Sequence, residues 1–274
     1  MALSHWRARL AQWSPAARKR VVGSLLALGV IAAIIAGPQA QGGYVNFADK
    51  RDCLGVPNFA DVVSNFGFLL VGLYGLWHLR RPRPTAFVEA FEISIYRWLF
   101  LGVVLTAMGS SYFHWAPHNE SLFWDRLPIT IVLMTLLCAT FAERVEIEFA
   151  RRWFVPLLVI GPAAALHWRW TVSLGAEDLR FYGLAQYLTL SIVVVLHVFP
   201  SRYRAAPWIL RGIVIYAIAK VFESYDNEVL WMTAGAISGH TAKHLFAAGG
   251  LLCIVMYLTR RQRVAHADID KNTQ

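Results

Sequence analysis

Two histidines near the end of the chain have a spacing that could bind a metal ion. His240 and His244 lie four residues apart in the segment SGHTAKHLF. On a helix this spacing places both imidazoles on one face, about one turn apart. One helix can offer two nitrogen ligands to zinc in this way, although the bare pattern is a weak motif. Two membrane-interface histidines with ordinary hydrogen bonds are the alternative interpretation of the pair.

A second group of polar residues lies earlier in the chain, in the segment GSSYFHWAPHNESLFWDRLP. Ser110 and His114 are again four residues apart, and Asp125 follows eleven residues later, beyond a short loop that contains Pro117. We expect this loop to turn the chain back, so that Asp125 lies near the level of Ser110 or His114 on an antiparallel helix. Alternatively, Ser110 bonds to a helix carbonyl and Asp125 is a favourable charge at a helix N-terminus.

Taken together, these five residues supply the parts of a hydrolytic metal site. Three histidines leave a fourth position open, which is typical of catalytic zinc. A carboxylate beside the metal can act as a general base. A serine hydroxyl can donate to a developing oxyanion. The set therefore predicts His114, His240 and His244 as zinc ligands, with Ser110 and Asp125 as catalytic residues.

The elements that must position these residues are predicted from the composition. The chain has 274 residues, of which 57% are hydrophobic and 16% are charged, whereas an average soluble domain is roughly 45–50% apolar and about 25% charged. We therefore expect an all-α, polytopic membrane protein rather than a soluble, disordered or fibrous one. The predicted spans are Val21–Ala36, Asp61–His78, Ile95–Trp115, Leu122–Phe141, Trp153–Trp168, Gly183–Phe199, Ile209–Tyr225 and Ile237–Leu258.

The distribution of basic residues predicts the orientation of these spans. The chain carries 26 Lys and Arg against 17 Asp and Glu, a formal net charge of +9. Most of the cations fall in loops on the side of the N-terminus, which the positive-inside rule places in the cytoplasm. We therefore expect both termini in the cytoplasm, an inner-membrane location in a bacterium, and the polar site in the periplasmic leaflet. The excess of basic residues then reflects membrane topology and does not indicate nucleic-acid binding.

Further polar residues occur in the last two spans. Ionisable groups inside a membrane are costly and favour functional hypotheses. Four of them are expected to contact the zinc ligands and orient them. These are Lys220, Glu223, Asp226 and Lys243. A simple ion pair between Lys220 and Glu223 is one alternative, and a proton-coupled transporter is another.

These patterns resemble the alkaline ceramidase family, within the wider superfamily of intramembrane hydrolases that includes the adiponectin-type receptors. The chain has S-x-x-x-H, an aspartate eleven residues on, and H-x-x-x-H in the last span. The surrounding sequence agrees: Gly109 precedes the serine, DRLP (125–128) stands where the family has Asp-Glu-Leu-Pro, and DVVSN (61–65) is similar to its Asn-Thr-x-Ser-Asn. The resemblance covers roughly residues 44–260.

The resemblance implies a fold and an activity. The family has a seven-helix bundle that holds zinc through three histidines, and its serine and aspartate match those named above. Its members hydrolyse the amide of ceramide to a sphingoid base and a free fatty acid. The implied organisation is a basic cytoplasmic N-terminus with one extra transmembrane helix in residues 1–43, the seven-helix core in 44–260, and a polar cytoplasmic tail in 261–274. The implied partner is a ceramide-like membrane lipid, with no nucleic acid and no obligate protein partner.

The family also carries an acidic calcium motif before its first core helix. Oxygen ligands of the kind that calcium prefers are present in this region: Asp49, Asp52, Asn58 and Asp61. Their order differs from that of the family, and Lys50 and Arg51 interrupt them. A calcium site and an ion-paired periplasmic loop are both open interpretations.

Two other functions compete with an amidase. One is a lipid-binding, receptor-like protein with a non-catalytic zinc, and the other is a hydrolase of a different N-acyl lipid. An open coordination position favours catalysis, because structural zinc sites normally take all four ligands from the protein.

Overall fold

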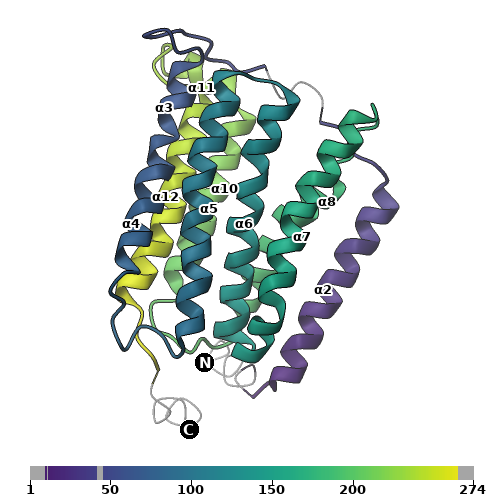
Figure 1. Ribbon diagram of the computed structural model, residues 1–274, viewed down its shortest axis with the longest axis vertical. Coiled ribbons are helices and arrows are strands. Elements are labelled where there is room, and N and C mark those ends of the chain that lie inside the picture. Colours follow the sequence, from purple (N-terminus) through teal and green to yellow (C-terminus); the bar gives the residue numbers. More distant parts are fainter. Residues whose placement is uncertain (1–9, 11, 42–45, 265–274) are drawn as a thin grey trace.

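The computed structural model describes residues 10, 12–41 and 46–264, which form a bundle of helices without a β-strand in these ranges (Figure 1). In two places successive helices stack end to end and form one column that crosses the bundle. Helix α3 is followed by α4 after Asn65, and the π-helical turn η1 (Leu184–Leu188) joins α8 to α9. The helices are α2 (Pro15–Ala36), α3 (Phe59–Ser64), α4 (Phe66–His78), α5 (Ala90–Trp115), α6 (Asn119–Arg144), α7 (Ile147–Ser173), α8 (Arg180–Gly183), α9 (Thr189–Leu196), α10 (Pro207–Ser224), α11 (Asp226–Met232) and α12 (Gly239–Arg260).

The all-α, multi-pass membrane fold predicted from the sequence is confirmed. Six helices are long and apolar enough to cross a membrane: α2, the α3–α4 column, α5, α6, α7 and α12. The other two predicted spans correspond to shorter columns, which are Arg180–Leu196 and the 18-residue helix α10. Helix α7 extends well beyond its predicted bounds at both ends and contains two prolines.

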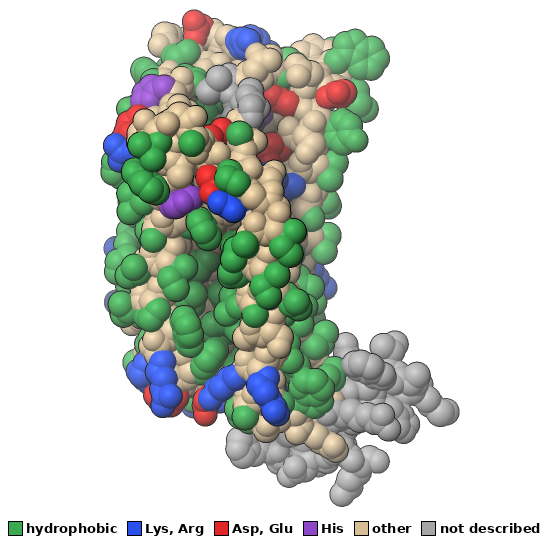
Figure 2. Space-filling model, turned by 90° about the vertical axis from the view of Figure 1, so that its right-hand side faces the viewer, with side chains coloured by type: hydrophobic (Ala, Val, Ile, Leu, Met, Phe, Trp, Pro, Cys, Tyr) green, Lys and Arg blue, Asp and Glu red, His purple; other side chains and the backbone are tan. Residues whose placement is uncertain are grey.

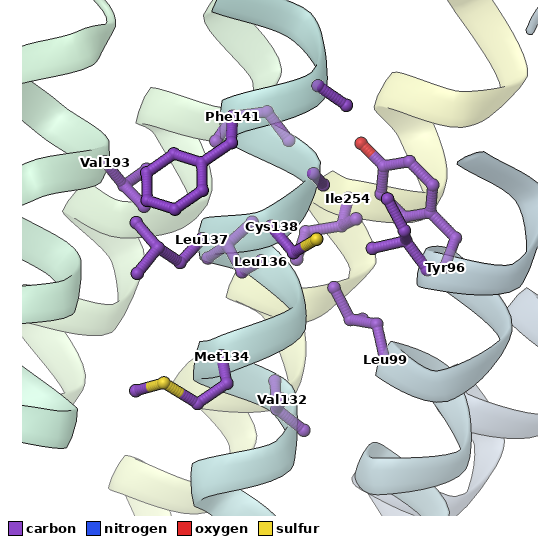
Figure 3. Packing of buried hydrophobic residues seen from close by; sticks show 14 of the residues in the cluster. Tyr96, Leu99, Val132, Met134, Leu136, Leu137, Cys138, Phe141, Val193 and Ile254 are labelled. Carbon is purple, nitrogen blue, oxygen red and sulfur yellow. The ribbon is translucent and has the colours of Figure 1, made fainter. Parts of the chain in front are cut away.

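Helix α6 lies at the centre of the bundle, whereas α2 lies at its edge. In the most apolar stretch of each helix, 78% of the residues of α6 are buried but only 6% of those of α2. Figure 3 shows side chains of α6 extending in two directions, with Leu137 and Phe141 near Val193 of α9 and Cys138 near Tyr96 of α5. An apolar core shared by α5, α6 and α9 therefore holds these three helices together, whereas α2 packs at the edge of the bundle.

Helix α2 contacts the bundle through apolar side chains, with Val22 buried in the core, and through polar contacts near its two ends. At one end Arg18 donates to the carbonyl of Arg144, and Lys19 pairs with Glu146. At the other end the guanidinium of Arg180 donates to the carbonyl of Ala33. Most of the basic segment before α2 (1–9) and the predicted tail beyond residue 264 lie outside the described residues.

A buried ionic network closes the end of the bundle where α2 begins and α12 ends. The guanidinium of Arg261 pairs with Glu92 at 3.0 Å and with Glu143 at 2.9 Å. Tyr203 donates to Glu92, and burial raises the pKa of its hydroxyl, which therefore stays a donor. On the face shown in Figure 2, Lys and Arg side chains gather at this end below a largely hydrophobic middle. We call it the basic end of the bundle.

Candidate metal centre

Three histidines converge at the opposite end of the bundle. His114, near the C-terminus of α5, meets His240 and His244 in the first turns of α12, and their ring centroids lie 4.7–5.0 Å apart. One nitrogen from each ring falls in a group whose atoms all lie within 4.8 Å of one another. The side chains are 1–5% exposed. The three predicted ligands thus lie close enough together to hold one metal ion.

The unsatisfied nitrogens of this group fit a metal ion. Nδ1 of His244 contacts the Ser64 hydroxyl at 2.7 Å, which leaves Nε2 as the nitrogen available for a metal. That Nε2 and the Nδ1 of His114 are buried without a hydrogen-bond partner. Buried polar atoms without a partner are costly, and a metal ion would satisfy them. Among the described residues this is the one group of three or more His, Cys, Asp or Glu side chains with such geometry.

The start of α12 is fixed by polar contacts, which orients both of its histidines. The Ser238 hydroxyl caps the helix by accepting from the backbone amide of Thr241 at 3.0 Å. Asp226, at the start of α11, accepts from the amide of His240 at 2.7 Å. Gly239 is required here, because a Cβ atom would lie 2.2 Å from the carbonyl oxygen of Phe222. The end of α5 is held similarly, since the Asn58 amide donates to the carbonyl of His114 at 2.9 Å.

Ser110 and Asp125 meet across the closest approach of α5 and α6. A Cβ atom on Gly109 would lie 2.0 Å from the carbonyl oxygen of Trp124, so the two backbones are nearly in contact at this point. The adjacent Ser110 and Asp125 of α6 are both buried, and they line the same cavity. Asp125 belongs to the second turn of a helix that begins at Asn119, so it is not the N-terminal charge of our alternative interpretation.

A cavity of about 390 Å³ connects these residues to the middle of the bundle. Ser110, Asp125 and His244 line its polar part. The remainder is mostly apolar and extends to Leu136 and Ile254, which lie at the level of the core in Figure 3. The cavity is therefore polar beside the histidines and apolar towards the middle of the bundle.

The predicted supporting residues divide into two groups. Glu223 contacts both Lys220 and Lys243, and the ammonium of Lys243 also lies 3.0 Å from Nε2 of His240. These three side chains line the cavity. Asp226 instead holds backbone amides, accepting from Ala48 at 2.9 Å as well as from the start of α12.

The oxygen ligands proposed for calcium do not converge in the same manner. Both carboxylate oxygens of Asp49 bond to Arg51, whose guanidinium lowers the pKa of that carboxyl. The Asn58 side chain is engaged with α5, and Asp52 is exposed. Asp61 is buried and accepts from the Thr241 hydroxyl at 2.6 Å. The region therefore matches the alternative of an ion-paired loop.

Two residues at the site carried no role in the sequence interpretation. Phe47 is buried against the rings of His114 and His240, with centroids 4.6 and 5.2 Å away, and it covers the histidines from the side of the loop before α3. Ser64 holds His244 from α3. Ser64 lies within the DVVSN segment that resembles the ceramidase family, which was a usable signal. No sequence pattern indicated a role for Phe47, because a single aromatic residue in a loop is not distinctive.

Comparisons with known proteins do not place the chain in a family. No family model matches the sequence, and no curated protein matches it significantly.

Proposed function

We propose that this protein is a zinc-dependent intramembrane amidase, which hydrolyses the N-acyl bond of ceramide-like lipids to a sphingoid base and a free fatty acid. The observation that carries the proposal is the position of the Ser110–Asp125 pair, which lines the same cavity as His244. A structural metal site would not need a carboxylate and a hydroxyl beside it. The apolar remainder of the cavity supports a lipid as the substrate.

The residues around the proposed metal have separate tasks in the reaction. A zinc ion held by the three histidines would activate water and polarise the amide carbonyl. The Asp125 carboxylate accepts the proton of the attacking water and returns it to the amide nitrogen as the carbon–nitrogen bond breaks. The Ser110 hydroxyl turns from Asp125 to the carbonyl oxygen and donates to it as negative charge develops. Burial of Ser110 and Asp125 excludes bulk water from these steps.

The membrane setting is part of the same proposal. The bundle has most of its basic residues at one end and the histidines near the other, and the positive-inside rule assigns the basic end to the cytoplasm. The proposed location is thus a bacterial inner membrane, with the amide bond cleaved in the periplasmic leaflet. A substrate whose polar group lies at that interface reaches the site without leaving the membrane.

The direct test measures metal content and fatty acid release with purified protein in detergent. We expect about one zinc ion per chain and release of fatty acid from a panel of ceramides. His244→Ala is expected to lose the zinc and to lower hydrolysis by at least about 10²-fold. His78→Ala, a histidine at the far end of α4, is the control and keeps both.

The outcomes separate the competing functions. Zinc without release of fatty acid from any N-acyl lipid would instead support a lipid-binding, receptor-like protein. Release that is unchanged in His244→Ala and insensitive to a zinc chelator would refute the proposed mechanism.

A further inference from the structure

A second cavity lies between α2 and α7, away from the histidines. It has a volume of about 540 Å³ and is hydrophobic apart from Lys19, His167 and Thr189. Phe141 of α6 lines it, whereas Leu136 on another face of α6 lines the cavity beside the histidines. Helix α6 therefore separates the two cavities, and the second one is not part of the proposed active site. We call it the α2–α7 groove.

The walls of the α2–α7 groove are regular faces of two membrane-spanning helices. On α2 the lining side chains recur every three or four residues, as they do on one face of a helix. On α7 they recur in the same way from Phe149 to His167, which is roughly 27 Å along a helix and close to the ~30 Å thickness of membrane hydrocarbon. Apolar cavities stay free of water, so hydrocarbon is the material that suits this groove.

Helix α2 is held beside the groove without filling it. It approaches the bundle closely at η1, where a Cβ atom on Gly29 would lie 2.5 Å from the Leu188 side chain. At the basic end, Lys19 pairs with Glu146 at the start of α7. Between these two points the groove-lining Gly23 faces open space, since nothing lies within 4 Å of the position of its missing Cβ atom. Such a space between apolar walls fits the acyl chain of a lipid.

Cations at the basic end of the groove indicate which headgroup this lipid would carry. Arg20 follows Lys19 on α2, and Arg152 precedes the groove-lining Trp153 on α7. Both arginines are exposed, and in the described part of the chain neither forms an ion pair, whereas Lys19 and Arg151 are paired with nearby carboxylates. Figure 2 shows Lys and Arg side chains gathered at this end of the hydrophobic face. Long basic side chains at helix ends reach the membrane interface, where the headgroups lie.

We propose that the α2–α7 groove binds an acyl chain of an anionic phospholipid of the membrane, with the phosphate at the basic end near Arg20 and Arg152. One acyl chain covers about half of the ~30 Å hydrocarbon layer, so it occupies the half of the groove lined by Val22, Gly23 and Leu26. The lipid links α2 to α7 and is a structural ligand, not a substrate. This inference does not depend on the proposed amidase function.

The headgroup is tested by native mass spectrometry of the delipidated, full-length protein with two lipids that share their acyl chains. We expect the first molecule of anionic phosphatidylglycerol to bind at least about tenfold more tightly than zwitterionic phosphatidylcholine, since each Lys or Arg near an anionic headgroup strengthens binding. The double variant Arg20→Gln/Arg152→Gln should abolish this preference. Arg80→Gln/Arg81→Gln removes two exposed cations after α4 and should retain it.

The groove is tested by filling it. Gly23→Phe places a ring in the open space beside this glycine, and should remove both the binding of the first lipid and the rise in apparent Tm that a bound ligand gives. Leu28→Phe alters an exposed position of α2 outside the groove and should leave both. Equal affinities of the two lipids for wild type, tight binding that persists in Gly23→Phe, or a lipid-free dimer that Gly23→Phe dissociates would each overturn the proposal.

Discussion

At the scale of single residues, the contact between Ser64 and His244 decides how one predicted metal ligand is presented. The hydroxyl contacts Nδ1 of the imidazole at 2.7 Å, and this fixes both the ring orientation and the nitrogen that faces the other histidines. Metal-binding histidines generally need such a second contact, and its loss weakens metal binding by about 10–100-fold. Ser64 itself is fixed by donating to the carbonyl of Asp61 at 2.9 Å.

We therefore expect Ser64→Ala to lower zinc affinity by about 10–100-fold without unfolding the protein. Competition with a chelator of known affinity measures this change. Ser191→Ala is a matched control, since Ser191 donates to a carbonyl of its own exposed helix surface and should not alter zinc binding. Equal affinities for wild type and Ser64→Ala would show that the hydroxyl does not orient the ring.

At the scale of secondary-structure elements, the crossing of α5 and α6 brings together the proposed catalytic pair. Gly109 lacks the Cβ atom that would meet the backbone of Trp124, so the helices approach closely at this level. The serine that follows it and Asp125 on the neighbouring helix line the same cavity. Side chains at both positions are buried. A small change in the spacing of the two helices would separate them.

Gly109→Ala tests this crossing. Alanine is favoured over glycine in a helix by roughly 0.5–1 kcal/mol, but here its methyl group would displace a backbone carbonyl, and overpacking of this kind typically costs about 1–3 kcal/mol. We expect a lower apparent Tm in detergent together with a loss of fatty acid release. Gly23→Ala on α2, where nothing lies within 4 Å, should be neutral or slightly stabilising. Wild-type behaviour of Gly109→Ala would mean that the helices do not approach so closely.

At the scale of the whole molecule, the two ends of the bundle have different tasks. The basic end is closed by the buried guanidinium of Arg261, which bridges Glu92 on α5 and Glu143 on α6. The other end carries the histidines and the polar part of the cavity. Stability and the proposed chemistry thus depend on charged groups at opposite ends of the same helices.

This division predicts that stability and zinc binding can be lost independently. Arg261→Leu would leave two carboxylates buried without their cation, and breaking a buried ion pair in this way costs about 3–5 kcal/mol. We expect a markedly lower apparent Tm with unchanged zinc affinity at temperatures where the protein stays folded. Arg260→Leu removes the neighbouring exposed cation and should have little effect on Tm. A parallel loss of zinc affinity in Arg261→Leu would show that the two ends are coupled.

The sequence by itself determined the features that depend on short-range periodicity. Apolar runs long enough to cross a membrane predicted six of the long helices, and four-residue spacings predicted that His240 and His244 share a helix face. It also predicted the neighbouring positions of Ser110 and Asp125, because a short loop forces consecutive helices to pack against each other. Each of these conclusions follows from local backbone geometry, which neighbouring residues fix.

Only the tertiary structure decided the contacts between segments that are distant along the chain. Ser64 meets His244, Phe47 covers the histidine rings, and Glu223 lies between two lysines on different helices. The same long-range packing directed Asp61 to Thr241, whereas the pairing of Asp49 with Arg51 is local, two residues along the chain. Sequence spacing cannot determine such contacts, because they depend on the rotation and depth of each helix, and these are fixed only when all the helices pack together.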